Sequence, residues 1–258
     1  MGANKAYSVP SIKRALAVLE LLAQSKRGLT ISRISRKLGL PSSSSYLITK
    51  TLEQEGFLQK NPLSGKYSFG LKLTSLSRRS LENLGLRDEA RPFLVQLMQR
   101  TALTVHMAIL ERNQAVIIEK VGCPGQVRLS SFVGKRLDSH CTGLGKTLVA
   151  FLPEEELEQQ IISRGFAKHN ENTLVSASAF KRELAGIREF GFALDDEEDE
   201  LGLRCLGAPI FAHTGKVVAA ISVAGTVSQI PDDRIGSLAK SVMQKAKEIS
   251  AVLGSRNG

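Results

Sequence analysis

The uneven placement of charge constrains the organisation of this chain more than any other feature. Residues 1–86 contain fourteen lysine and arginine residues and four acidic residues, whereas residues 87–258 contain twenty-one of each kind. The formal net charge of +10 therefore belongs entirely to the first third of the chain. A basic segment joined to a neutral one favours a module that binds a polyanion over a generally basic, soluble surface. We therefore expect nucleic acid as the partner of the first segment.

Two short helices are predicted at the start of the basic segment. Residues 11–24 have apolar side chains at helical spacing, with Ser11 as the expected N-cap. A second helix, residues 31–38, ends at Gly39, and Pro41 opens a third, which is the outline of a helix-turn-helix motif. The predicted buried stripe of the first helix is Ile12, Leu16, Leu19 and Ala23.

The third predicted helix, residues 42–55, is the candidate recognition helix. Its buried side is expected to hold Leu47, Ile48, Thr51 and Leu52. The opposite side carries small hydroxyls, one tyrosine and one lysine, which suits a groove lined by phosphates. A serine-rich capping stretch on a solvated helix has the same composition.

A predicted hairpin completes the basic segment. Residues 57–60 and 66–69 are strand-like, and residues 61–65 have the composition of a turn. Three helices and a basic hairpin predict a winged helix-turn-helix domain. The residues expected to contact DNA are Thr30, Ser42, Ser43, Tyr46, Thr49, Lys50, Lys60 and Lys66.

The remaining two thirds mix strand pairs with helices. Residues 102–110 with 114–121, and 205–212 with 216–224, predict two hairpins. Helices are predicted over 144–152, 154–164, 178–190 and 233–253. This interleaving predicts an α+β domain with helices packed on an antiparallel sheet. The expected organisation is a winged helix-turn-helix domain over 1–70, an amphipathic linker helix over 71–86 and a larger domain over 87–258.

The chain resembles the IclR family of bacterial transcriptional regulators over nearly its whole length. The N-terminal match runs from Ser11 through the glycine turn to Gly56-Phe57-Leu58 and the wing. The effector-domain match rests on the segment His140–Ala150 and on a spaced set: Gly191, Asp195, Glu198, Cys205-Leu206-Gly207, Ile210 and Phe211. Ala212 departs from the family, which usually has an acidic or amide residue there.

The resemblance implies a GAF-like effector domain with a pocket over its sheet, and a small organic acid as the ligand. A carboxylate is stabilised by the free N–H groups at a helix N-terminus, which Gly143 and Leu144 are expected to provide. Ala224 replaces a serine that members often have, so we expect a ligand with more apolar surface than a two-carbon acid. The implied effector-binding residues are Leu129, Leu137, Gly143, Leu144, Asp195, Leu203, Cys205 and Ser222.

The implied partners are double-stranded DNA with a pseudo-palindromic operator and a second copy of the chain, as a homodimer or dimer of dimers. No signal sequence or apolar run of about twenty residues is present, so we expect a cytoplasmic protein without membrane contact. Three unclustered cysteines indicate free thiols in a reducing compartment.

Three other interpretations compete with this one. Gly145-Lys146-Thr147 suggests a P-loop, but His140 stands where the motif needs its first glycine, so no nucleotide cofactor is expected. Cys205 could be the nucleophile of a thiol enzyme, with His140 as its base. Alternatively, the chain could be a DNA-binding protein that needs no ligand. Zinc is not expected, because the candidate ligands match no standard spacing: His106, Cys123, His140, Cys141, Cys205 and Asp195.

Overall fold

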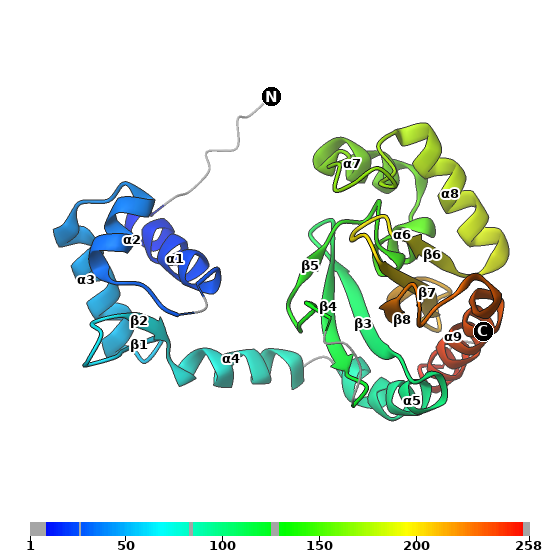
Figure 1. The fold of residues 1–258 in the computed structure, drawn as a ribbon, viewed down its shortest axis with the longest axis horizontal. Helices are drawn as coiled ribbons and strands as arrows, with labels where there is room; N and C mark the ends of the chain where they lie inside the picture. Colours follow the sequence, from blue (N-terminus) through cyan, green and yellow to red (C-terminus); the bar gives the residue numbers. More distant parts are fainter. Residues whose placement is uncertain (1–8, 26, 83–84, 125–128, 255–258) are drawn as a thin grey trace. The chain divides into compact units, whose positions relative to one another are not determined.

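The computed structural model describes residues 9–25, 27–82, 85–124 and 129–254, so residues 83–84 of the expected linker lie outside the described part. The chain divides into two compact units, residues 1–83 and 84–258 (Figure 1). Among the described residues, no helix is long and apolar enough to cross a membrane.

The first unit has the predicted winged helix-turn-helix elements. Its helices are α1 (Pro10–Ala23), α2 (Ile31–Leu38) and α3 (Ser42–Gln54), the wing strands are β1 (Leu58–Lys60) and β2 (Tyr67–Phe69), and α4 (Leu71–Glu82) follows. Gly39 ends α2 in the left-handed conformation, with φ of 63°, and its N–H donates to the Ser35 carbonyl. A glycine adopts this conformation without steric cost, which explains the sharp turn between the two helices.

The predicted buried face of α1 is wrong in part: Leu19 packs against the core, but most of the predicted stripe does not. Ile12 and Leu16 are 57% and 53% exposed, whereas Val18 and Leu22 enter the core. This helix carries two neighbouring apolar stripes, so periodicity alone does not decide which one packs. The helix also begins one residue earlier than expected, with Val9 as its N-cap, so Ser11 is not the cap.

The predicted face of α3 is rotated in the same way. Leu47 is 64% exposed, and Thr51 is also exposed. Ser45 and Thr49 are fully buried instead, beside the partly buried Ile48. The Thr49 hydroxyl donates to the Ser45 carbonyl of its own helix, 2.7 Å away, which allows a polar side chain to be buried.

The second unit is built on a six-stranded antiparallel sheet with the order β5-β4-β3-β8-β7-β6. The predicted hairpins are β3 (Thr104–Glu111) with β4 (Gln114–Val121), and β7 (Leu203–Phe211) with β8 (Val217–Thr226). Pairing of β3 with β8 joins them at the centre, and β5 (Arg136–Leu137) and β6 (Ala193–Asp196) form the edges. The α+β prediction is confirmed.

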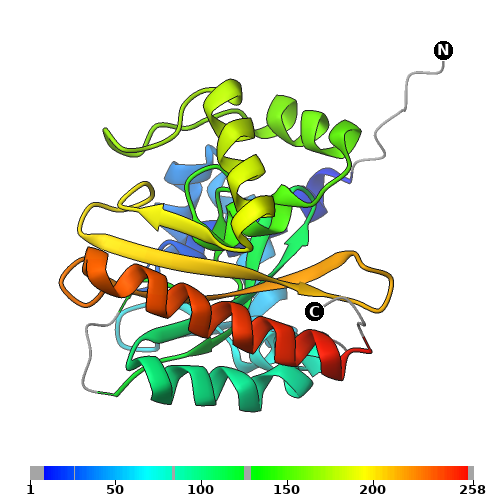
Figure 2. The same cartoon turned by 90° about the vertical axis from the view of Figure 1, so that its right-hand side faces the viewer.

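Helices cover both faces of this sheet. The helices α5 (Gly85–Thr101) and α9 (Asp232–Val252) lie side by side on one face (Figure 2). The other face carries α6 (Gly143–Ala150), against which α7 (Glu154–Arg164) and α8 (Ala177–Phe190) pack through a shared apolar cluster. The four helices predicted in this part of the sequence, α6 to α9, are present within two residues of their expected bounds.

Two glycines bring the start of α6 directly onto β7. A Cβ atom on Gly207 would lie 2.6 Å from the Gly143 carbonyl oxygen, and one on Gly143 would lie 3.1 Å from the Cys205 carbonyl oxygen. The first distance is too short for a real Cβ atom, and the second is tighter than most Cβ contacts. The backbone of the α6 N-terminus therefore lies against the strand that carries Cys205.

Candidate DNA-binding surface and effector pocket

The exposed side of α3 keeps part of the predicted DNA-binding set. Ser42 and Ser43 are exposed, and Tyr46 is 50% exposed. Thr49 is wrong as a DNA contact, because its side chain is buried and its hydroxyl is used within the helix. Thr30 is half-buried at the N-cap position of α2, 3.1 Å from the Ser32 hydroxyl.

Lys50 is not a free cation. Its Nζ lies 2.9 Å from Glu53 Oε2, and this hydrogen bond and the Glu53 charge raise the pKa of Lys50 above its usual value. To contact a phosphate, the Lys50 ammonium group must therefore break its ion pair with Glu53 or bind both groups at once. Lys50 follows Ser43 by about two helical turns, so the two residues lie on the same side of α3.

The wing is held by its turn. Asn61 Oδ1 accepts hydrogen bonds from the backbone N–H groups of Leu63 and Ser64, at 3.0 and 2.9 Å. Lys60 is exposed, with its Nζ 5.8 Å from the centre of the Tyr67 ring, and Lys66 is half-buried. Both lysines lie next to this hydrogen-bonded turn, and their contacts with DNA phosphates stay a prediction.

The second unit contains a cavity of about 80 Å³ between the sheet and the start of α6. Six of the eight predicted effector-binding residues line it: Leu129, Leu137, Leu144, Asp195, Leu203 and Cys205. Gly143 and Ser222 are not in the lining; Gly143 is the first residue of α6, and Ser222 is fully buried in β8, opposite His106 and Gly207. Ala224, the replaced serine position, also lines the cavity.

The cavity includes polar residues that sequence analysis did not assign to it. His106 is buried with its Nε2 atom 2.7 Å from Ser131 Oγ. Burial, and then the charges of Lys120 and Lys135, lower the pKa of His106 to about 3, so this imidazole is neutral at physiological pH. Lys120 Nζ donates to the carbonyls of Leu129 and Ser131 and so fixes the segment that covers the pocket. Alternation along β3 places His106 on the pocket face.

Asp195 is the acidic group of the pocket. It lies opposite Cys205 in the β6–β7 pairing, and its Oδ1 atom accepts hydrogen bonds from the N–H groups of Glu198, at 2.9 Å, and Asp199, at 3.4 Å. Burial raises the pKa of Asp195 to about 7. Asp195 therefore changes its charge near neutral pH, which an exposed carboxyl does not do.

Cys205 is poorly suited to act as a nucleophile. Burial, followed by the charge of Asp195, raises the pKa of the Cys205 thiol to about 12. His140, the base considered for it, has its Nε2 atom 2.9 Å from the Ala167 carbonyl oxygen. A reactive cysteine needs a lowered pKa and an adjacent base, so this arrangement disfavours a thiol enzyme.

A buried ion-pair network supports the loop that holds Asp195. Lys146 is fully buried in α6, and its Nζ contacts Glu198 Oε1 at 2.5 Å and Glu183 Oε1 at 2.9 Å. Burial opposes the charge of Lys146, but the two carboxylates raise its pKa above the usual value. Lys146 is thus a structural cation that ties α6 to the loop after β6, rather than a nucleotide-binding lysine.

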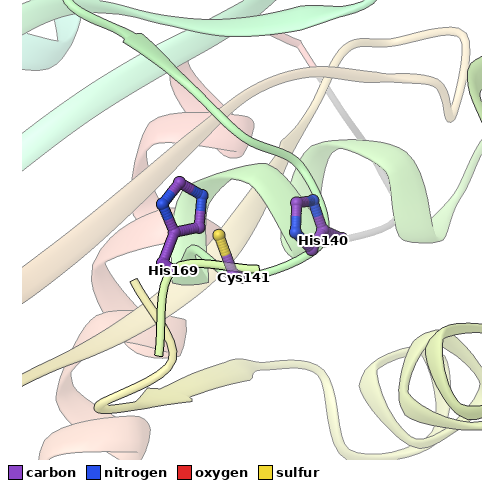
Figure 3. Close-up of side chains that lie close together, drawn as sticks. All are labelled: His140, Cys141 and His169. Carbon is purple, nitrogen blue, oxygen red and sulfur yellow. The ribbon is translucent and has the colours of Figure 1, made fainter. Parts of the chain in front are cut away.

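One cluster has the residue types of a metal site. His140, Cys141 and His169 each place a ligand atom within 4.8 Å of the other two (Figure 3). His140 and Cys141 lie in the turn before α6, not on a strand, so they do not point apart as a strand would require. Each side chain also has a protein partner: the Ala167 carbonyl for His140, Asp199 for Cys141 and Asp138 for His169.

The comparisons with known proteins agree with both units. Residues 11–62 match the IclR helix-turn-helix domain, and residues 78–251 match the C-terminal domain of the bacterial transcriptional regulator IclR. The chain is 34% identical over 246 residues to the HTH-type transcriptional regulator XynR of Escherichia coli (strain K12), a match that covers 95% of this chain and 98% of that protein.

Solved structures share the architecture. The Thermotoga maritima IclR has a TM-score of 0.79 at 32% identity, covering 95% of this chain and 98% of that one. An IclR homolog from Microbacterium hydrocarbonoxydans, solved in complex with 4-hydroxybenzoate, has a TM-score of 0.82 at 24% identity, covering 95% and 99%. The chain belongs to the IclR family of bacterial transcriptional regulators.

Proposed function

We propose that this regulator binds a specific DNA operator through α3 and the wing, and that a small organic acid in the pocket of the second unit changes its affinity for that operator. The observation that carries the proposal is the cavity beside the α6 N-terminus, where apolar side chains from several elements meet the buried carboxyl of Asp195. A partly open, mostly apolar cavity with a few polar groups suits a small ligand.

The pocket favours a carboxylic acid with an apolar body. In the proposed pose, the carboxylate accepts hydrogen bonds from the N–H groups of Gly143 and Leu144, where the helix dipole favours negative charge. A hydroxyl or carbonyl group of the ligand lies toward Asp195 and Cys205. The leucine walls and Ala224 then contact an aromatic or branched skeleton. The 4-hydroxybenzoate complex of the Microbacterium homolog has a ligand of this class.

We propose a homodimer, or a dimer of dimers, on a pseudo-palindromic operator in the cytoplasm. One winged domain covers a half-site, so high affinity requires two copies. The exposed leucines and isoleucine of α1 and α4 supply an apolar surface for the second copy: Ile12, Leu16, Leu71 and Leu76. In this organisation residues 1–70 form the DNA-binding domain and residues 87–258 form the effector-binding domain. Residues 71–86 connect the two domains.

Three experiments with the whole chain test the proposal. Selection from a random duplex library should enrich one sequence family, and a thermal-shift panel of organic acids should identify at least one stabilising acid. Asp195→Ala should abolish the effect of that acid on DNA binding and leave the ligand-free DNA affinity within a few-fold of wild type.

The outcomes separate the competing functions. Sequence enrichment without any stabilising acid would favour a regulator that binds DNA independently of ligand. Asp195→Ala responding to the acid as wild type does would remove the pocket from the proposal. Failure to enrich any sequence would overturn the DNA-binding function itself.

A further inference from the structure

We propose that Leu47 is a base-reading residue of α3 and that it recognises the C5-methyl group of a thymine in the major groove. The inference rests on the proposed DNA-binding function and adds the chemical group that the helix reads. It depends on an exposed leucine that the hydrophobic pattern had placed in the core.

Leu47 occupies the middle of the outer face of α3. It is 64% exposed, while Ile48 and Leu52 on the other side pack against the core of the first unit. At about 100° per residue, Ser43, Leu47 and Lys50 lie within about 60° of one another around the helix axis. Leu47 is therefore not the edge of the buried stripe but an apolar side chain on the water-facing side.

The positive charge of the first unit favours DNA as the partner that contacts this face of α3. Arg33, Arg36 and Lys37 on α2 are exposed, and so is Lys60 on the wing. An apolar side chain on a surface for a protein partner is usually surrounded by other apolar residues. Leu47 instead lies between the exposed hydroxyl residues Ser43 and Thr51 on a strongly basic unit, which complements a polyanion with a small apolar group inside its groove.

Thymine supplies that group. In the major groove every base edge offers hydrogen-bond donors or acceptors, and only the thymine C5-methyl group is apolar. A leucine side chain has no hydrogen-bonding atom, so a thymine methyl is the base feature that it distinguishes. Leu47 is the sixth residue of α3, in the N-terminal half that contacts bases in helix-turn-helix proteins.

The neighbouring residues leave this role to Leu47. Thr49 is buried, and the Lys50 ammonium is paired with Glu53. Ser43, one turn before Leu47, and Thr51, one turn after it, are exposed hydroxyls that can reach flanking base edges or phosphates. Leu47 is then an apolar contact between two small polar ones, beside the exposed ring of Tyr46.

The test removes a single methyl group from the DNA. A duplex selected by the full-length wild-type chain is remade with each thymine of the half-sites replaced in turn by deoxyuridine, which lacks only the C5-methyl. At one position per half-site we expect about fourfold weaker binding, the effect of losing one buried methyl contact. Leu47→Ala should bind the parent duplex more weakly and show no further loss on that deoxyuridine duplex.

Leu63→Ala is the matched control. Leu63 is 97% exposed at the wing tip, so the variant removes an equally exposed leucine from the same unit and should retain the fourfold response. Thermal melts of both variants verify that they fold. The inference is overturned, with the DNA-binding function intact, if no deoxyuridine position weakens wild-type binding or if Leu47→Ala keeps the full response. If no duplex is selected, the proposed function and this inference fall together.

Discussion

The shifted pKa of Asp195 predicts that acid binding depends on pH. In the proposed pose a ligand carboxylate enters a pocket that contains this buried carboxyl. The protonated form of Asp195 is neutral and can donate a hydrogen bond, whereas the ionised form repels the anion. The acid should therefore bind the protonated form, and its affinity should fall as the pH rises.

The magnitude follows from the pKa of about 7. Asp195 is then protonated in about 90% of molecules at pH 6 and in about 10% at pH 8, and the apparent affinity scales with the competent fraction. We expect about tenfold weaker binding at pH 8 than at pH 6. His106, with a pKa of about 3, and Cys205, with a pKa of about 12, keep one charge state over this range and do not contribute.

Isothermal titration calorimetry at several pH values, with the acid that gives the largest thermal shift, measures this dependence. Repeating the titration at pH 7 in buffers of different ionisation enthalpy should reveal an uptake of about half a proton per bound acid, since half of Asp195 must be protonated. Asp195→Asn is the control, because it is neutral at every pH, and its affinity should be independent of pH. A flat wild-type profile, or the same slope in Asp195→Asn, would refute the reasoning.

Three further predictions concern the rest of the molecule. Lys60→Ala with Lys66→Ala should weaken binding to every duplex and reduce the slope of log K against log salt by about one unit per lost phosphate contact; an unchanged slope would remove the wing from the interface. Lys146→Ala should lower the free energy of unfolding by about 3–5 kcal/mol in urea titrations, because it leaves Glu198 buried without its cation. The half-buried Lys181, paired with Glu154, is the control, and an equal loss in Lys181→Ala would contradict a buried network. Light scattering should return a dimer or tetramer, so a 28 kDa monomer at micromolar concentration would contradict the proposed assembly.

Local signals in the sequence were sufficient for most of the elements but not for the faces that they bury. Glycine and proline positions marked the ends of α2 and the wing turn, and long β-branched runs marked the central strands. Helix α5 was not predicted; Pro92 lies inside it, and a proline normally signals a helix boundary. Strand β6 has only four residues, too few for alternation to be recognised.

The helix faces depended on tertiary packing. Both α1 and α3 have two faces that could be buried. In α1 the buried face includes Val18. In α3 it includes Thr49, whose hydroxyl bonds to its own helix. Sequence periodicity does not show that a threonine hydroxyl donates a hydrogen bond to a carbonyl of its own helix and can therefore be buried. This is why Leu47 was assigned to the core and Thr49 to the DNA surface.

The effector pocket was predicted through the family resemblance more than through spacing. Its lining comes from segments more than one hundred residues apart, such as His106 and Ala224, which only the β3–β8 pairing brings to one sheet face. His106 gave no signal in the sequence beyond its position in a β-branched run. Likewise, His169 is distant in sequence from His140 and Cys141, so their cluster could not be found from ligand spacing.

The proposed function requires that the pocket and the DNA surface are energetically coupled, and reciprocal titration measures this coupling. Fluorescence anisotropy would measure the affinity for the selected duplex with and without saturating acid, and calorimetry would measure the affinity for the acid with and without the duplex. Both affinities should change by the same factor, between about 5-fold and 150-fold, and Asp195→Ala should abolish both changes. An acid that binds the pocket while the DNA affinity stays constant would contradict the proposed coupling.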